Sequence, residues 1–375
     1  MNSKTRNQSK FSACGLATVL LTASLAVAKS YDIAVDTLSL AADVVDKTMP
    51  AFPEDEDMRK GQEGWVQLNF VVAPDGSVVD PIVVDSVGGE AFEQSAVDAV
   101  SDWTFEPSDE EVANNSVAIR FERSNDSGKA SRNFMRWYKM ILTDLASDKV
   151  EDARANLERA KAFGGWNLYE SSILAIVEGR VADGEGNDNL RREALRQALN
   201  IGDSNALNAK TKRELLASLV RIETEQQRFV DAGEALDALR DTKGHASVIE
   251  SLEEEIRALE AGIAEATEIT VPGVVSTPCD RESGQALWAH KPSLRHFAIE
   301  NIDGDIERVE ARCDSGRLVA PIDSQEAWSI PEAWGDCEVF VFGEDGASFA
   351  FVESPAIKED NELAEGALAS SIVQD

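Results

Sequence analysis

The chain has 375 residues, of which 69 are acidic and 36 basic, so its formal net charge is −33. A surface this acidic repels nucleic acid and anionic lipid, which excludes nucleic-acid binding from the expected roles. The length exceeds what one hydrophobic core normally holds and predicts two or three domains.

The first 28 residues have the layout of a secretory signal peptide. Its basic residues are Lys4, Arg6 and Lys10. A largely apolar run follows from Phe11 and ends in the small residues of Ala26-Val27-Ala28, which fit a signal peptidase site. Cys14 lies at the start of the apolar run rather than after it, which does not fit a lipid-modified cysteine. We expect cleavage and a periplasmic protein, the alternative being a retained inner-membrane anchor that faces the periplasm.

Cleavage would leave 33 basic residues against 69 acidic ones, a net charge of about −36. No later segment is apolar over the length needed to cross a bilayer. We therefore expect this protein to meet a membrane only through partners or through a retained N-terminal anchor.

Residues 45–123 predict a small α+β domain, with one helix on an antiparallel sheet. We expect two strands, Trp65–Val72 and Val78–Val84, joined by the turn Pro74-Asp75-Gly76. An amphipathic helix over Glu90–Ser101 and a last strand over Val117–Phe121 are expected to follow.

Motifs of the same region resemble the TonB C-terminal domain family. They are Pro50-Ala51-Phe52-Pro53, Gly64-Trp65-Val66, Asp75-Gly76, Ala96-Val97-Asp98-Ala99-Val100 and Trp103-Thr104-Phe105-Glu106-Pro107. The resemblance implies capture of an envelope partner's peptide by strand addition, the partners including TonB-dependent outer-membrane receptors. It places the binding strand at Val117, Ala118, Ile119, Arg120 and Phe121. A plain core-forming strand is the alternative for each of these residues.

The chain departs from the TonB pattern in its arrangement. The domain lies near the N-terminus, long regions follow it, and the proline-rich spacer of the family is absent. Together with the expected cleavage, these departures put energy transduction in doubt and leave partner binding intact.

Residues 131–266 show helical periodicity almost without proline. Paired apolar stripes with a repeat near 35 to 45 residues resemble tetratricopeptide-type helical hairpins, although a plain antiparallel bundle shows the same stripes. A single last helix is expected over about Ser247–Ala266.

Residues 272–355 return to strands and predict a small β sandwich or barrel. Three cysteines would remain in the mature chain, and an oxidising compartment favours a disulfide. Cys313 and Cys337 end two expected strands that bracket one loop, so we predict this pair and leave Cys279 as the odd thiol. The acidic tail over 356–375 is expected to be mostly disordered.

Catalytic and cofactor chemistry has little support in the sequence. Ser204 ends a helical stretch and has no suitably placed base. Cys279, His290 and His296 lack the further ligands of a zinc site, and the loop over Asp183–Asn189 lacks the glycine and glutamate of a calcium loop. We expect no catalytic residue, no metal and no cofactor, and hence a protein that is not an enzyme.

Two functions fit these observations. The first is a periplasmic TonB-like protein that binds envelope partners by strand addition in the context of TonB-dependent transmembrane transport. The second is a periplasmic scaffold for envelope assembly that uses the helical repeats and transduces no energy.

Overall fold

The computed structural model describes residues 31–53, 61–124, 129–202, 207–265, 267–277, 285–322 and 327–355. The expected signal peptide, Ser204, Cys279 and the acidic tail lie outside these residues. Among the described residues, no helix combines the length and the apolar character that a membrane span requires.

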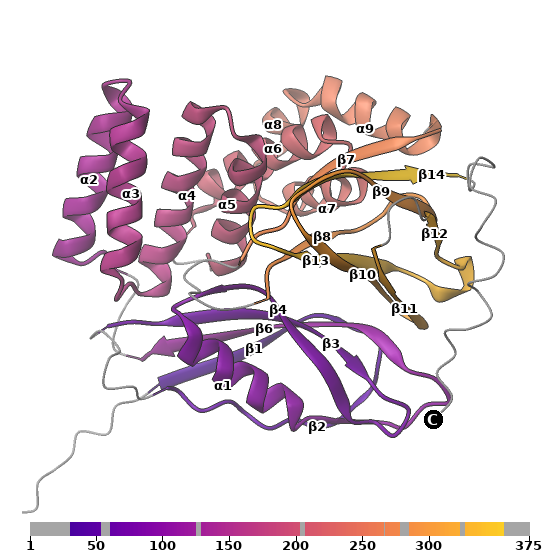
Figure 1. The fold of residues 1–375 in the computed structure, drawn as a ribbon. Helices are drawn as coiled ribbons and strands as arrows, with labels where there is room; N and C mark the ends of the chain where they lie inside the picture. Colours follow the sequence, from indigo (N-terminus) through magenta and orange to yellow (C-terminus); the bar gives the residue numbers. More distant parts are fainter. Residues whose placement is uncertain are drawn as a thin grey trace, which may run out of the picture.

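The N-terminal module is an antiparallel sheet with a helix on one face (Figure 1). The sheet order is β1-β6-β3-β4, and the bounds are β1 Tyr31–Leu40, β3 Gly64–Val72, β4 Val78–Val87, β6 Val112–Arg123 and α1 Glu90–Ser101. A separate two-stranded ladder joins β2 Val44–Asp46 to β5 Thr104–Phe105. The predicted helix and hairpin are confirmed, and the strand β1 is an addition that the sequence patterns did not predict.

Local sequence explains the hairpin and the helix of this module. The turn between β3 and β4 places Gly76 at φ 86°, in the left-handed region that glycine adopts without strain, and Asp75 accepts hydrogen bonds from Ser77. On α1, Phe92 and Ala96 recur at helical spacing and are fully buried against the sheet.

The helical region consists of successive helices that pack mostly on their neighbours in sequence. Their bounds are α2 Arg132–Ala146, α3 Val150–Phe163, α4 Leu168–Glu185, α5 Asp188–Ile201, α6 Ala209–Glu225, α7 Phe229–Arg240, α8 Ala246–Glu250 and α9 Glu253–Glu265. The prediction of one last helix is wrong, because the chain turns between α8 and α9 at Ser251 and Leu252. Leu252 is fully buried in the core at this turn.

The C-terminal strands form two four-stranded antiparallel sheets, ordered β11-β10-β13-β8 and β12-β9-β14-β7. Their bounds are β7 Ile269–Val274, β8 Leu287–His290, β9 His296–Asp303, β10 Ile306–Cys313, β11 Gly316–Pro321, β12 Ala327–Ser329, β13 Cys337–Gly343 and β14 Ser348–Ser354. Trp288 of the first sheet lies 5.1 Å from Phe349 and 5.3 Å from Phe351 of the second, measured between ring centroids. These aromatic contacts join the two sheets.

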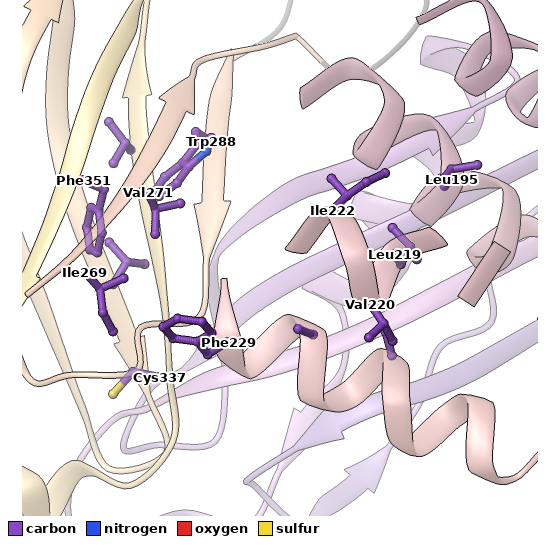
Figure 2. Packing of buried hydrophobic residues seen from close by; sticks show 14 of the residues in the cluster. Leu195, Leu219, Val220, Ile222, Phe229, Ile269, Val271, Trp288, Cys337 and Phe351 are labelled. Carbon is purple, nitrogen blue, oxygen red and sulfur yellow. The ribbon is translucent and has the colours of Figure 1, made fainter. Parts of the chain in front are cut away.

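The later helices and the C-terminal sheets share one hydrophobic core. Leu219 and Ile222 of α6 belong to the same buried cluster as Val271 and Phe351 of the sheets. Figure 2 shows Phe229, at the start of α7, lying between the helices and the strands. The first helices, α2 to α4, have a separate cluster, which includes Phe134, and the helical region is therefore divided between two cores.

Candidate peptide-binding edge

The strand β6 is an interior strand of the N-terminal sheet. It pairs with β1 on one side and with β3 on the other, and the register places Ile119 opposite both Val35 and Val66. The expectation that Val117–Phe121 presents a free edge is therefore wrong. The physical reason is that the segment Tyr31–Leu40 forms a strand of its own and satisfies the backbone groups that a partner peptide would have used.

The side chains of this segment are also buried. Val117, Ile119 and Phe121 are fully buried in the core beneath α1, while Ala118 packs on the opposite face in a cluster with residues of the helical region. Arg120 forms an ion pair with Asp36 of β1 at 3.1 Å and donates to the backbone carbonyl of the last residue of α5. These residues therefore belong to a core-forming strand, which is the alternative that the sequence left open.

Both faces of the N-terminal sheet are covered by other parts of the protein. Helix α1 covers one face, and the second face packs on the helical region and on the C-terminal sheets (Figure 1). Polar contacts secure the second face: Arg312 of β10 donates to the side-chain oxygen of Asn69 at 3.0 Å, and Arg317 pairs with Asp80 at 2.6 Å. A partner that adds to this sheet must therefore use one of its two edges.

The edge at β4 is poorly suited to accept another strand. Pro81 lies inside β4 and has no backbone N–H to donate. Asp80 has a positive φ of 47°, and the pairing of β4 with β3 shifts register twice. Prolines and bulges of this kind are devices that protect sheet edges from pairing.

The edge at β1 is long and open by comparison. Its ten residues contain neither proline nor glycine, and among the residues that the structure describes β1 is the terminal strand of its sheet. Side chains from Asp36 to Ser39 are exposed, and Leu38, at the bulge opposite β6, is 52 % exposed. An unpaired row of backbone groups on such a strand is a template for β-strand addition.

Alternate side chains hold β1 in place. Tyr31 stacks on Phe52 with ring centroids 4.0 Å apart, and the guanidinium of Arg123 lies over the Tyr31 ring. Ile33 and Val35 are half-buried and pack against the core beneath α1. The same alternation was present in the sequence of Tyr31–Leu40 and is the signal by which the strand could have been predicted.

The remaining sequence-based sites are accounted for in part by the structure. Cys313 and Cys337 form the predicted disulfide. His290 forms a hydrogen bond with Glu353 at 2.7 Å, and His296 forms one with Ser329 at 2.6 Å. The two histidines lie in different sheets. Throughout the described part of the chain, no group of three or more His, Cys, Asp or Glu residues is placed to hold a metal ion.

The expected loop over Asp183–Asn189 is mostly helical. Its first residues form the last turn of α4, and Gly186 caps that helix with φ 68°. Asn187 then accepts a hydrogen bond from the backbone of Leu190 as the N-cap of α5. The segment is a tight connection between two helices, which agrees with the interpretation as a turn.

The module built on these strands matches a known protein family. The family described as Gram-negative bacterial TonB protein C-terminal matches residues 48–123, about a fifth of the chain. The match is consistent with a domain that acts by protein–protein interaction in the envelope. No curated protein matches the chain. The strand β1 lies before the matched residues and is therefore outside the part that the family describes.

Proposed function

We propose that this protein is a periplasmic TonB-like protein that binds an extended segment of an envelope partner along the outer edge of β1. The observation that carries the proposal is the contrast between the two edges of the N-terminal sheet. The β4 edge contains Pro81 and two register shifts, whereas the edge of Tyr31–Leu40 is uninterrupted by proline. The family match supports an envelope polypeptide as the partner, and outer-membrane receptor peptides in TonB-dependent transport are the proposed ligands.

Addition to β1 is favoured over replacement of β1. Replacement exposes Tyr31, Ile33 and Val35, which are half-buried, and this costs about 3 kcal/mol at roughly 1 kcal/mol for each half-buried side chain. The incoming peptide restores the backbone hydrogen bonds that β1 gives up, so these bonds provide no net gain. The tethered β1 also competes at an effective concentration in the millimolar range. A free peptide at micromolar concentration has neither handicap if it pairs with the outer edge.

A disulfide lock between β1 and β6 tests addition against replacement. Asp32 and Glu122 lie directly opposite each other in register, so an Asp32→Cys, Glu122→Cys variant allows the two strands to be cross-linked. Binding of synthetic N-terminal peptides of TonB-dependent outer-membrane receptors to the full chain is measured by fluorescence anisotropy. We expect equal affinity for the oxidised and the reduced forms. Loss of binding on oxidation, with recovery on reduction, would show replacement of β1 and overturn the proposed site.

A matched pair of proline variants tests the edge itself. The backbone N–H groups of adjacent residues point to opposite sides of a strand, so Ala34→Pro and Val35→Pro remove one donor that faces β6 and one that faces outward. The variant that loses the outward donor is expected to keep its melting temperature and to lose peptide binding. If both variants bind as well as the original chain, or if the unmodified chain binds none of the peptides, the proposed function is wrong.

A second candidate is a periplasmic scaffold for envelope assembly without energy transduction. The observation that favours it is the docking of the N-terminal sheet on the rest of the chain through buried contacts such as that between Arg312 and Asn69. Such docking suits a rigid assembly platform, with the proposed tetratricopeptide-like hairpins α2 to α7 as a further surface. If this second candidate is correct, the chain should still capture envelope partners when a proline variant blocks the outer edge of β1.

A further inference from the structure

A cavity of about 780 Å³ lies where the three regions of the chain meet. Its wall is formed by β4 and β6 of the N-terminal sheet, by α5 and α7 of the helical region, and by β8 and β13 of the C-terminal sheets. The volume falls in the range of sites that hold small organic molecules. Leu38 and Ser39 of β1 also line the cavity, but the inference drawn from it rests on residues outside β1 and does not depend on the proposed function.

Three arginines meet on the helical side of the cavity, and two of them share the buried carboxylate of Asp231. Arg196 lies one turn after Arg192 on α5, and Arg228 precedes the first residue of α7. Asp231 joins two of the three, at 3.0 Å from Arg196 and 2.8 Å from Arg228. Glu223 accepts a further hydrogen bond from Arg196 at 2.6 Å. The charge of Arg196 is therefore well compensated.

Arg192 lacks comparable compensation. Its side chain is only 8 % exposed, and among the described residues its carboxylate partner is its sequence neighbour Glu193 at 3.4 Å. Within the same part of the chain, the buried Nε atom of Arg192 has no hydrogen-bond partner. Burial, followed by the nearby positive charge of Arg228, lowers the pKa of Arg192 to about 10. A buried guanidinium held in this way is destabilised until an anion reaches it.

Two further buried atoms, in residues that line the cavity, have no hydrogen-bond partner in the part of the chain that the structure describes. The side chain of Arg228 is 4 % exposed, and its Nη1 atom has no partner although Nε bonds to Asp231 and Nη2 to the carbonyl of Ala289. His290 bonds through Nε2 to Glu353, and its Nδ1 atom is unpaired. Burial and the charge of Arg228 lower the pKa of His290, so the ring is neutral and Nδ1 is an acceptor. The residues that line the cavity therefore include two buried donor atoms and one buried acceptor atom without a partner.

We propose that this cavity binds a small organic molecule through its oxyanion group, a carboxylate or a phosphate, which accepts hydrogen bonds from Nε of Arg192 and Nη1 of Arg228. Both atoms are buried donors without a partner on the wall of one cavity. Hydrogen bonds between a charged donor and a charged acceptor are the strong ones, and an arginine fork fits the planar or tetrahedral oxygens of these groups.

Thermal unfolding and isothermal titration calorimetry on the full chain test the site with inorganic phosphate and with malate, against sodium chloride of equal ionic strength. The test variant is Arg192→Gln, and the matched control is Arg240→Gln, which removes an exposed arginine of α7 that pairs with Asp237. We expect phosphate or malate to raise the melting temperature of the original chain and of the control beyond the effect of sodium chloride. The affinity should fall roughly tenfold or more in Arg192→Gln.

The same variant separates a binding role from a structural one. Without added ligand, Arg192→Gln is expected to melt at the same temperature as the original chain or higher, because it removes an uncompensated buried charge. Arg192→Lys keeps the charge but not the Nε donor, so weak binding is expected. A response to malate alone or to phosphate alone identifies the oxyanion. No response to either, or an equal response in Arg192→Gln, would overturn the proposal.

Discussion

Replacement of Glu310 tests how strongly a buried ion network joins the C-terminal sheets to the N-terminal module. The Glu310 side chain is 2 % exposed and accepts hydrogen bonds at 2.7 Å from Nε of Arg312 and of Arg317. Arg312, which is 1 % exposed, reaches from there to Asn69 of the N-terminal sheet. Burial lowers the pKa of Arg312, and the charge of Glu310 opposes that shift. Glu310 is therefore the carboxylate that pairs directly with this buried cation.

The variant Glu310→Gln keeps the shape of the side chain and removes its charge. Loss of one partner from a buried ion pair costs about 3–5 kcal/mol, and we expect the lower limit because Arg317 keeps its contact with Asp80. At roughly 2 °C per kcal/mol, the melting temperature should fall by about 6 °C. The measurement is thermal and urea unfolding followed by circular dichroism.

Two further variants decide whether charge compensation is the reason. Glu307→Gln lies on the same strand and changes a side chain that is 62 % exposed, so its melting temperature should stay close to that of the original chain. Adding Arg312→Met to Glu310→Gln removes both buried charges and should recover much of the lost stability. The reasoning is refuted if Glu310→Gln unfolds like Glu307→Gln, or if the double variant is less stable than Glu310→Gln alone.

Burial raises the pKa of Asp85, half-buried in the cavity wall, to about 7, so the folded state holds its proton at pH values where the unfolded state has lost it. Relative to Asp85→Asn, the free energy of unfolding of the original chain should therefore fall as the pH rises from about 4 to about 7. After allowance for partial exposure, the expected fall is about 1–2 kcal/mol. If urea unfolding gives the same difference between the two proteins across this range, the assignment is contradicted. Gly64→Ala would place a Cβ 2.3 Å from the Phe92 ring and should cost about 1–3 kcal/mol. In the control variant Gly233→Ala on α7, the added Cβ meets nothing within 4 Å and should stabilise the helix by up to about 1 kcal/mol. Equal melting temperatures for the two glycine variants would be evidence against the close packing of Gly64.

The sequence determined the elements whose signals are local. The alternation in Trp65–Val72, the turn at Asp75-Gly76 and the helical spacing over Glu90–Ser101 each depend on residues a few positions apart, and all are present in the structure. The disulfide between Cys313 and Cys337 was also predicted, because each cysteine was expected at the end of a strand; in the structure β11, β12 and a short 3-10 helix lie between the two cysteines. The motifs that resemble the TonB family lie in the same region, which the family match covers.

Only the tertiary structure decided which groups meet across the chain. The partner of β6 is a strand about 80 residues earlier, and no local period states whether a strand lies at an edge or in the interior of a sheet. The cavity likewise needs Arg192, Arg228 and His290 from three separate elements. Their unpaired atoms follow from how the helices and sheets pack, because burial and hydrogen-bond partners are properties of the assembled fold and not of neighbouring residues in the sequence.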